Sequence, residues 1–250
     1  MVFFIGLSFG SFLNALVWRT WQNIRIVQGR SMCPACHRKL AWWENIPLFS
    51  FIALGGRCLV CKNTISRQYP IVEFSMGIVF VVVALLRGNP ITFITPELVR
   101  DWALVFVLAF VFLYDLNYGE ILDGATIPTS ILLFAFSWSM GWQTWPDMML
   151  GAAIGAGFFG LQYIMSKGKW VGGGDIRLGL LMGIILGWPN ILFALMLAYI
   201  LGAIVSLVLV AIKKKGWKSE TPFGTYLAVA TFVAMMWGDV VVGWYVGLLR

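Results

Sequence analysis

Long apolar segments recur along almost the whole chain and constrain its fold more than any other feature of the sequence. We predict eight helices, at 2–18, 71–86, 102–116, 127–142, 148–165, 177–187, 191–212 and 225–249. A helix that crosses the hydrocarbon core of a bilayer needs about 20 apolar residues. The third and sixth segments are therefore short, and seven spans are the alternative if the fifth or the sixth is re-entrant. With 60% hydrophobic and 12% charged residues, the chain could not hide its apolar side chains in a soluble core. The sequence predicts an all-α, polytopic membrane protein.

The distribution of positive charge predicts the orientation of the chain in the membrane. If Trp18 marks the cytoplasmic end of the first helix, only Arg87, Arg100 and Arg250 of the 18 lysines and arginines lie outside, and the other 15 (18 minus 3) lie in the cytoplasm. An excess of positive charge in cytoplasmic loops is typical of membrane proteins. The net charge of +7 is therefore attributed to cytoplasmic loops rich in lysine and arginine, and no nucleic-acid partner is expected.

The only long polar stretch, at 19–70, contains all four cysteines. They form two C-x-x-C pairs, Cys33 with Cys36 and Cys58 with Cys61. Two such pairs about 20 residues apart are typical of a zinc site with four thiolate ligands. A domain this small also needs a metal ion or disulfides to be stable, because its hydrophobic core is too small. Four free thiols or two disulfides are the alternative, and the reducing cytoplasm disfavours disulfides. We predict a small cytoplasmic domain whose zinc ion is structural, because four protein ligands leave no position for a reacting water.

Of the eleven carboxylates, we single out two that adjoin apolar helices at the predicted cytoplasmic face of the membrane. Asp115 lies near the end of the third predicted helix, and Asp175 follows three glycines just before the sixth. An ionisable group at a membrane helix is costly and is a candidate for function. Two neighbouring carboxylates would share a proton, so that one activates a water while the other polarises a peptide carbonyl. The glycines, Gly172 to Gly174, are expected to allow close backbone approach and unusual backbone dihedral angles beside Asp175.

The acidic residues also allow simpler interpretations. Asp175 could cap the N-terminus of its helix, and Asp115 could pair with a lysine of a loop. Asp123 could replace Asp115 as the partner of Asp175, although a role as a cap or in positioning is the preferred prediction. Glu73, at the start of the second predicted helix, is a further candidate for contact with a substrate.

The order of these motifs resembles that of the bifunctional bacterial type IV prepilin peptidases, which combine leader peptidase and N-methyltransferase activities and belong to the GxGD class of aspartyl proteases. The resemblance runs over essentially the whole chain. The motifs that carry it, besides the two cysteine pairs, are Gly10-Ser11-Phe12-Leu13-Asn14, Glu44-Asn45-Ile46-Pro47, Tyr69-Pro70-Ile71-Val72-Glu73, Asp115 with Asp123, Gly172-Gly173-Gly174-Asp175 and Pro222-Phe223-Gly224. Two positions depart from the family pattern: Leu122 stands where proline is usual, and Arg177 where lysine is usual.

The resemblance implies a function for each part of the chain. Asp115 and Asp175 would be the catalytic pair. The candidates for positioning the substrate are Gly172, Gly174, Asp123, Arg177 and Glu73. The enzyme would cleave the leader peptide of prepilins or pseudopilins at the cytoplasmic face of the bacterial inner membrane and methylate the new N-terminal amine, with S-adenosylmethionine as the donor. The corresponding domains are a first transmembrane helix at 1–18, a zinc domain at 19–70 and a transmembrane aspartyl protease domain at 71–250.

Two other classes of function compete with the protease. A membrane scaffold that recruits a partner through the zinc domain would explain the cysteines and the helices, but it leaves the two aspartates and the glycine run without a role. A small transporter would place acidic residues deep within the span and would show inverted repeats, and neither feature is clear in the sequence.

Overall fold

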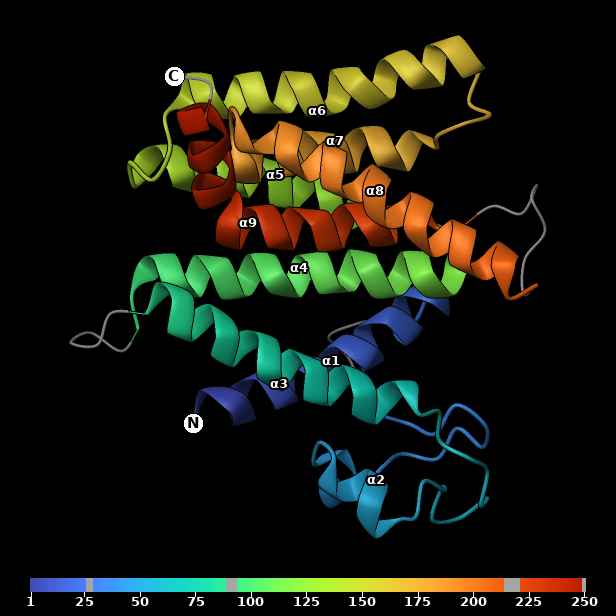
Figure 1. The fold of residues 1–250 in the computed structure, drawn as a ribbon. Helices are drawn as coiled ribbons and strands as arrows, with labels where there is room; N and C mark the ends of the chain where they lie inside the picture. The colour runs from blue at the N-terminus through green and yellow to red at the C-terminus, as the bar shows by residue number, and fades with distance from the viewer. Residues whose placement is uncertain (26–28, 89–93, 214–220, 249–250) are drawn as a thin grey trace. The chain divides into compact units, whose positions relative to one another are not determined.

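The computed structural model describes residues 1–25, 29–88, 94–213 and 221–248. Within these ranges it contains nine α-helices and one short 3-10 helix, and the extended backbone forms only isolated β-bridges. The all-α prediction is therefore confirmed. The chain divides into two compact units, Met1–Phe106 and Val107–Arg250 (Figure 1).

Unit 1 is built on two long helices, α1 (Val2–Trp21) and α3 (Gln68–Arg87), which pack along one another (Figure 1). Glycines of α1 make this contact close. A Cβ atom added at Gly6 would lie 2.6 Å from the carbonyl oxygen of Met76, and one added at Gly10 would lie 2.7 Å from the Cα atom of Glu73. Small residues that let two backbones approach are typical of helix pairs in lipid.

The predicted polar domain lies between these two helices in the sequence. It contains the 3-10 helix η1 (Trp42–Asn45), the short helix α2 (Phe49–Ala53) and two β-bridges, Met32 with Lys39 and Arg57 with Thr64. Each β-bridge closes the loop that carries one pair of cysteines, so most of this domain consists of loops.

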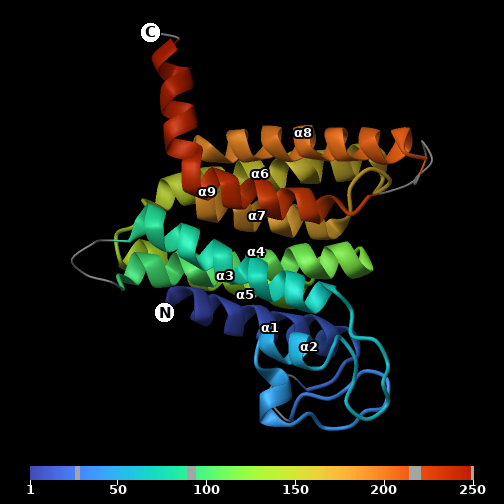
Figure 2. The same ribbon diagram turned by 60° about the horizontal axis from the view of Figure 1, so that its bottom comes forward.

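Helix α4 (Pro96–Tyr118) begins in unit 1 and continues into unit 2. The other helices of unit 2 are α5 (Asp123–Ser139), α6 (Trp145–Ser166), α7 (Gly173–Leu186), α8 (Asn190–Ala211) and α9 (Phe223–Leu248). Helix α7 packs against α5, α6, α8 and α9, and nine of its 14 residues are buried. Figure 2 shows α8 alongside the first part of α9, which bends before its C-terminal end.

The closest helix pair of unit 2, α6 with α7, also depends on glycines. A Cβ atom at Gly155 would lie 2.1 Å from the carbonyl oxygen of Gly179, and one at Gly183 would lie 2.1 Å from that of Gly151. The two backbones therefore touch without side chains between them. This seam positions the N-terminal turn of α7, which carries Asp175.

Each of the eight predicted helices corresponds to a helix of the structure, α1 or one of α3 to α9. The predicted end of the last helix at residue 249, and Arg250, lie outside the described residues. The third helix is longer than predicted: α4 has 23 residues and starts at Pro96, where proline suits the first turn and the Thr95 hydroxyl accepts a hydrogen bond from Leu98 N at 3.2 Å.

Five helices in the described part of the chain are long and apolar enough to cross a membrane: α1, α3, α6, α8 and α9. Helices α5 and α7, with 17 and 14 residues, are shorter than the roughly 20 residues that a span requires. The chain thus has the helices of a multi-pass membrane protein.

Candidate active site and metal centre

Asp115 lies on α4, is only 4% exposed, and is fixed by the start of α9. The backbone N–H of Thr225 donates a hydrogen bond of 2.8 Å to its Oδ2 atom. Gly224 is required beside it, because a Cβ atom at this position would lie 2.9 Å from the same oxygen. A carboxylate at the N-terminus of a helix also meets the positive end of the helix dipole. The alternative that Asp115 pairs with a loop lysine finds no support, since no ion pair of Asp115 occurs among the described residues.

Asp175 lies in the first turn of α7 and is 7% exposed. Its Oδ2 atom accepts a hydrogen bond of 2.8 Å from the backbone N–H of Gly172, so Asp175 caps its own helix. The capping interpretation is therefore confirmed as geometry, and it is compatible with a chemical role because it engages only one carboxylate oxygen.

The glycines before Asp175 differ in part from the expectation. Gly172 has ordinary extended dihedral angles (φ −80°, ψ 162°), and none of the three has a positive φ, so the expectation of unusual dihedral angles was wrong. Close approach is what Gly174 provides, because a Cβ atom there would lie 2.8 Å from the Cβ atom of Ile121. The turn after α4 therefore packs directly on the start of α7.

Both aspartates line one cavity of about 1210 Å³ in unit 2. The cavity is also lined by the turn between α4 and α5, by Gly172 and Gly174 at the start of α7 and by Phe223 at the start of α9. The structure thus brings together the two acidic residues that the sequence singled out, in a space that can hold an extended peptide segment.

Asp123 and Arg177 meet at the same cavity but form their own pair. The Arg177 guanidinium forms an ion pair with the Asp123 carboxylate, and the two side chains are 45% and 50% exposed. The pair ties the first turn of α5 to the first turn of α7. Asp123 is thus the ion-pair partner of Arg177, and it lines the cavity together with Asp115 and Asp175.

Sequence reasoning assigned no role to several residues at this site. Gly224 and Thr225 position Asp115, and the only signal for them was the Pro222-Phe223-Gly224 motif. Tyr199 of α8 donates a hydrogen bond of 2.9 Å to Gln162 of α6, and both line the cavity. An isolated tyrosine and an isolated glutamine on apolar helices gave no such signal.

In unit 1, the four cysteines converge as predicted. The Sγ atoms of Cys33, Cys36, Cys58 and Cys61 all lie within 4.8 Å of one another, and no disulfide joins them. A tetrahedral site with metal–sulfur bonds of about 2.3 Å has sulfur–sulfur edges of about 3.8 Å, and the Cys33 and Cys61 sulfurs are 3.9 Å apart. The four residues could therefore hold a metal ion.

The two cysteine loops have the same backbone geometry. Cys33 N donates to Arg38 O and Cys58 N to Asn63 O, each at 2.9 Å. In both loops the residue after the second cysteine has a positive φ, 55° at His37 and 58° at Lys62. His37, the only histidine, therefore occupies a turn position equivalent to that of a lysine.

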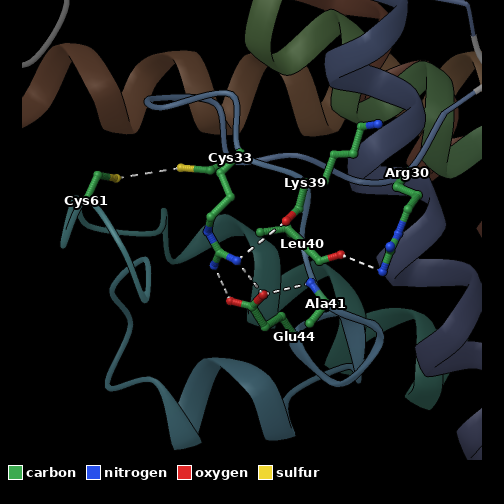
Figure 3. Close-up of polar contacts among 8 residues, drawn as sticks. Arg30, Cys33, Lys39, Leu40, Ala41, Glu44 and Cys61 are labelled. Atoms are coloured by element: carbon green, nitrogen blue, oxygen red, sulfur yellow. Dashed lines mark hydrogen bonds and ion pairs between the residues drawn. The ribbon is translucent and has the colours of Figure 1, made fainter.

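A charged pair connects the first cysteine loop to η1 (Figure 3). Arg38 forms an ion pair with both carboxylate oxygens of Glu44, and Glu44 Oε2 also accepts a hydrogen bond of 2.7 Å from Ala41 N. The hydrogen bonds from Arg38 lower the pKa of Glu44. The charges of Arg38 and Glu44 neutralise one another within the domain, so the pair serves to fix the first cysteine loop against η1.

Glu73 is placed at the cysteine-containing domain. It is 7% exposed on α3 and accepts a hydrogen bond of 2.8 Å from the backbone N–H of Leu48, which precedes α2. It lines a cavity of about 390 Å³ within unit 1, together with Cys33 and Cys58. Of the five candidates for positioning the substrate, Glu73 alone lines this cavity.

Comparison with known proteins adds two family matches. Residues 4–86 match the bacterial peptidase A24 N-terminal domain, and residues 102–207 match the type IV leader peptidase family. No solved structure is significantly similar to the chain.

Several curated relatives match over nearly the full length, and each is named prepilin leader peptidase/N-methyltransferase. The relative from Pseudomonas putida is 31% identical over 94% of this chain and 89% of its own length. The relative from Aeromonas salmonicida (strain A449) is 30% identical over 100% and 94%. The relative from Myxococcus xanthus (strain DK1622) is 34% identical over 94% and 70%.

Proposed function

The chain belongs to the type IV leader peptidase family, and we propose that Asp115 and Asp175 are the groups with which it cleaves prepilin leader peptides. Like the relatives named above, it is a prepilin leader peptidase and N-methyltransferase. The observation that carries the assignment of the residues is the shared cavity, which is lined by two buried carboxylates, one from α4 and one from α7.

The geometry supports an aspartic protease mechanism. Two adjacent carboxyl groups share one proton, because both cannot ionise cheaply. The ionised group takes a proton from a water molecule, whose oxygen attacks the carbonyl carbon of the scissile bond, while the protonated group donates its proton to the carbonyl oxygen. The tetrahedral intermediate then breaks at the carbon–nitrogen bond. The carboxyl group that took the proton of the water gives it to the leaving nitrogen, and the other carboxylate takes back the hydroxyl proton as the new carboxyl product forms, which restores the pair.

The hydrogen bonds to each aspartate suit this role. Thr225 N and Gly172 N each hold one oxygen, Oδ2, of Asp115 and Asp175 respectively. The second oxygen of each carboxyl group then serves the water or the peptide. Gly172 and Gly174 line the cavity without side chains, and the Asp123–Arg177 ion pair joins the starts of the two helices beside it.

We infer that the cysteines hold a structural zinc ion. The support is the four-thiolate donor set, which is typical of structural zinc, and the sulfur positions, which fit a tetrahedron. The methyltransferase activity implies S-adenosylmethionine, which supplies the methyl group when bound. The domains proposed for these roles are a first span at 1–18, the zinc domain at 19–70 and the protease domain at 71–250. The excess of positive charge favours an inner-membrane enzyme with its zinc domain and active site at the cytoplasmic side, and prepilins or pseudopilins as substrates in contact with lipid.

Cleavage of a prepilin in purified membranes tests the catalytic pair. We expect Asp115→Asn and Asp175→Asn each to lower the cleavage rate by at least about 100-fold, because asparagine keeps the size but cannot ionise. Asp239→Asn is the matched control, since Asp239 accepts a hydrogen bond from Asn190 and does not line the cavity. Full cleavage by either active-site variant would refute the assignment. Loss of function only in cysteine variants would favour a recruiting scaffold.

A further inference from the structure

The cavity of unit 1 has the size of a small-molecule site. Its volume is about 390 Å³, within the range of roughly 300–1,000 Å³ that is typical of ligand pockets. Residues of α1, α2, α3 and both cysteine loops line it, and apolar groups predominate. It belongs to unit 1 alone and shares no lining residue with the cavity of the two aspartates.

Glu73 is a buried carboxylate of this cavity that forms no ion pair within the described residues. Its neighbours are the backbone N–H of Leu48, which donates at 2.8 Å, and the Ser11 side chain. Arg19, a buried cation of the same wall, directs its guanidinium at the carbonyl oxygens of Gly29 and Arg30. The other acidic residue of the wall, Glu44, is paired with Arg38. A buried carboxylate without a counter-ion favours a cationic ligand.

Aromatic side chains surround the same space. Trp18 of α1, Phe51 of α2 and Tyr69 of α3 all line the cavity. Aromatic faces attract cations and also stack against planar heterocycles. A carboxylate among aromatic rings therefore suits a ligand that combines a positive charge with a flat, weakly polar ring.

We propose that this cavity binds S-adenosylmethionine and that the Glu73 carboxylate balances the ligand's positive charge. The ligand contains both required features, an adenine ring and a sulfonium cation. This inference rests on the methyltransferase part of the proposed function, and it assigns the binding site of the methyl donor to unit 1. It gives Glu73 a role at the methyl donor in place of contact with the peptide that is cleaved.

The charge at Glu73 also distinguishes the donor from its product. Methyl transfer forms a carbon–nitrogen bond at the substrate amine, which releases a proton to solvent, and breaks the carbon–sulfur bond of the donor. The sulfur keeps the electron pair and becomes a neutral thioether, so S-adenosylhomocysteine has one positive charge fewer. A buried carboxylate then holds the donor more tightly than the product and favours release after transfer.

Calorimetric titration of the zinc-loaded, full-length protein in lipid nanodiscs tests the site with S-adenosylmethionine and S-adenosylhomocysteine. We expect Glu73→Gln to weaken binding of S-adenosylmethionine by at least about tenfold and to change binding of S-adenosylhomocysteine much less. Glutamine can still accept the hydrogen bond from Leu48 N. Glu97→Gln is the matched control, because Glu97 is an exposed carboxylate in the first turn of α4 and does not line the cavity.

A second variant tests the cavity without a change of charge. Ser50 of α2 lines it and is half-buried, so Ser50→Trp should fill the space and weaken both ligands by at least about tenfold. Zinc content and thermal unfolding establish that each variant is folded.

Unchanged affinities in both variants, or equal losses of both ligands in Glu73→Gln, would overturn the proposal. If the wild-type protein methylates a prepilin while these affinities do not respond, only the location is wrong. If the wild-type protein neither binds S-adenosylmethionine nor methylates a prepilin, both the proposed site and the methyltransferase part of the proposed function are wrong.

Discussion

The glycine seam between α6 and α7 leads to a prediction with an internal control. Gly155 faces the backbone of Gly179, and a Cβ atom at Gly155 would lie 2.1 Å from the Gly179 carbonyl oxygen, whereas ordinary contact begins at 3.4 Å. The substitution Gly155→Ala therefore requires the two helices to separate by about 1.3 Å (3.4 minus 2.1). Gly157→Ala is the control, because nothing lies within 4 Å of a Cβ atom at that position on the same helix.

The displacement reaches the proposed active site, because Gly179 lies one helical turn after Asp175. Overpacking of a tight contact costs about 1–3 kcal/mol, and a displacement of about 1 Å in a catalytic group can cost about 100-fold in rate. We expect Gly155→Ala to lower the rate of leader cleavage by about 10- to 100-fold and to lower the thermal unfolding temperature in detergent. Gly157→Ala should match wild type in both. Equal cleavage and equal unfolding temperatures for the two variants would refute the argument that the seam sets the position of α7.

Three further predictions concern the other contacts. Gly224→Ala should lower the rate of leader cleavage by at least about tenfold, because its Cβ atom would lie 2.9 Å from Asp115 Oδ2. Thr225→Val loses only the hydrogen bond from the hydroxyl to Pro222 O, which contributes about 1 kcal/mol, so its cleavage rate should stay within about fivefold of wild type. Comparable rates in the two variants would contradict this argument. Asp123→Asn breaks an exposed ion pair, which contributes at most about 1 kcal/mol, so the steady-state rate of cleavage should fall by less than about fivefold. A larger fall in rate would mean that Asp123 contacts the substrate. Removal of the metal by a chelator should unfold the cysteine loops and open residues 31–66 to limited proteolysis; continued protection would show that the loops fold without a metal.

The pair of aspartates that we propose as catalytic could be identified from the sequence, because a carboxylate next to an apolar helix is costly and therefore conspicuous. The cysteine site was accessible because the spacing of the ligands lies within two short loops. The anchors of Asp115 were not, because Thr225 acts through its backbone N–H and lies 110 residues away in the chain. A backbone donor at a helix N-terminus has no side-chain signature, so only the three-dimensional arrangement reveals it.

The start of α4 shows a different kind of failure. Hydropathy falls at Arg100 and Asp101, so the prediction began the helix at Trp102, but the structure continues it back to Pro96. Asp101 is fully buried, where it forms ion pairs with Arg87 and Arg100. Charges that neutralise one another inside the protein do not interrupt a helix, and a scan of single residues cannot recognise the pairing.

The shortness of α7 has a consequence for where the peptide bond is cut. With 14 residues, α7 is about 21 Å long, about 9 Å less than the hydrocarbon thickness of roughly 30 Å. The rest of that depth must be filled by protein or by water, because lipid cannot satisfy exposed backbone groups. The cavity at the Asp175 end of α7 supplies such a space. If Asp115 and Asp175 are the catalytic pair, as we propose, hydrolysis takes place in water that is recessed into the bilayer, and the substrate has to bring its scissile bond below the lipid headgroups.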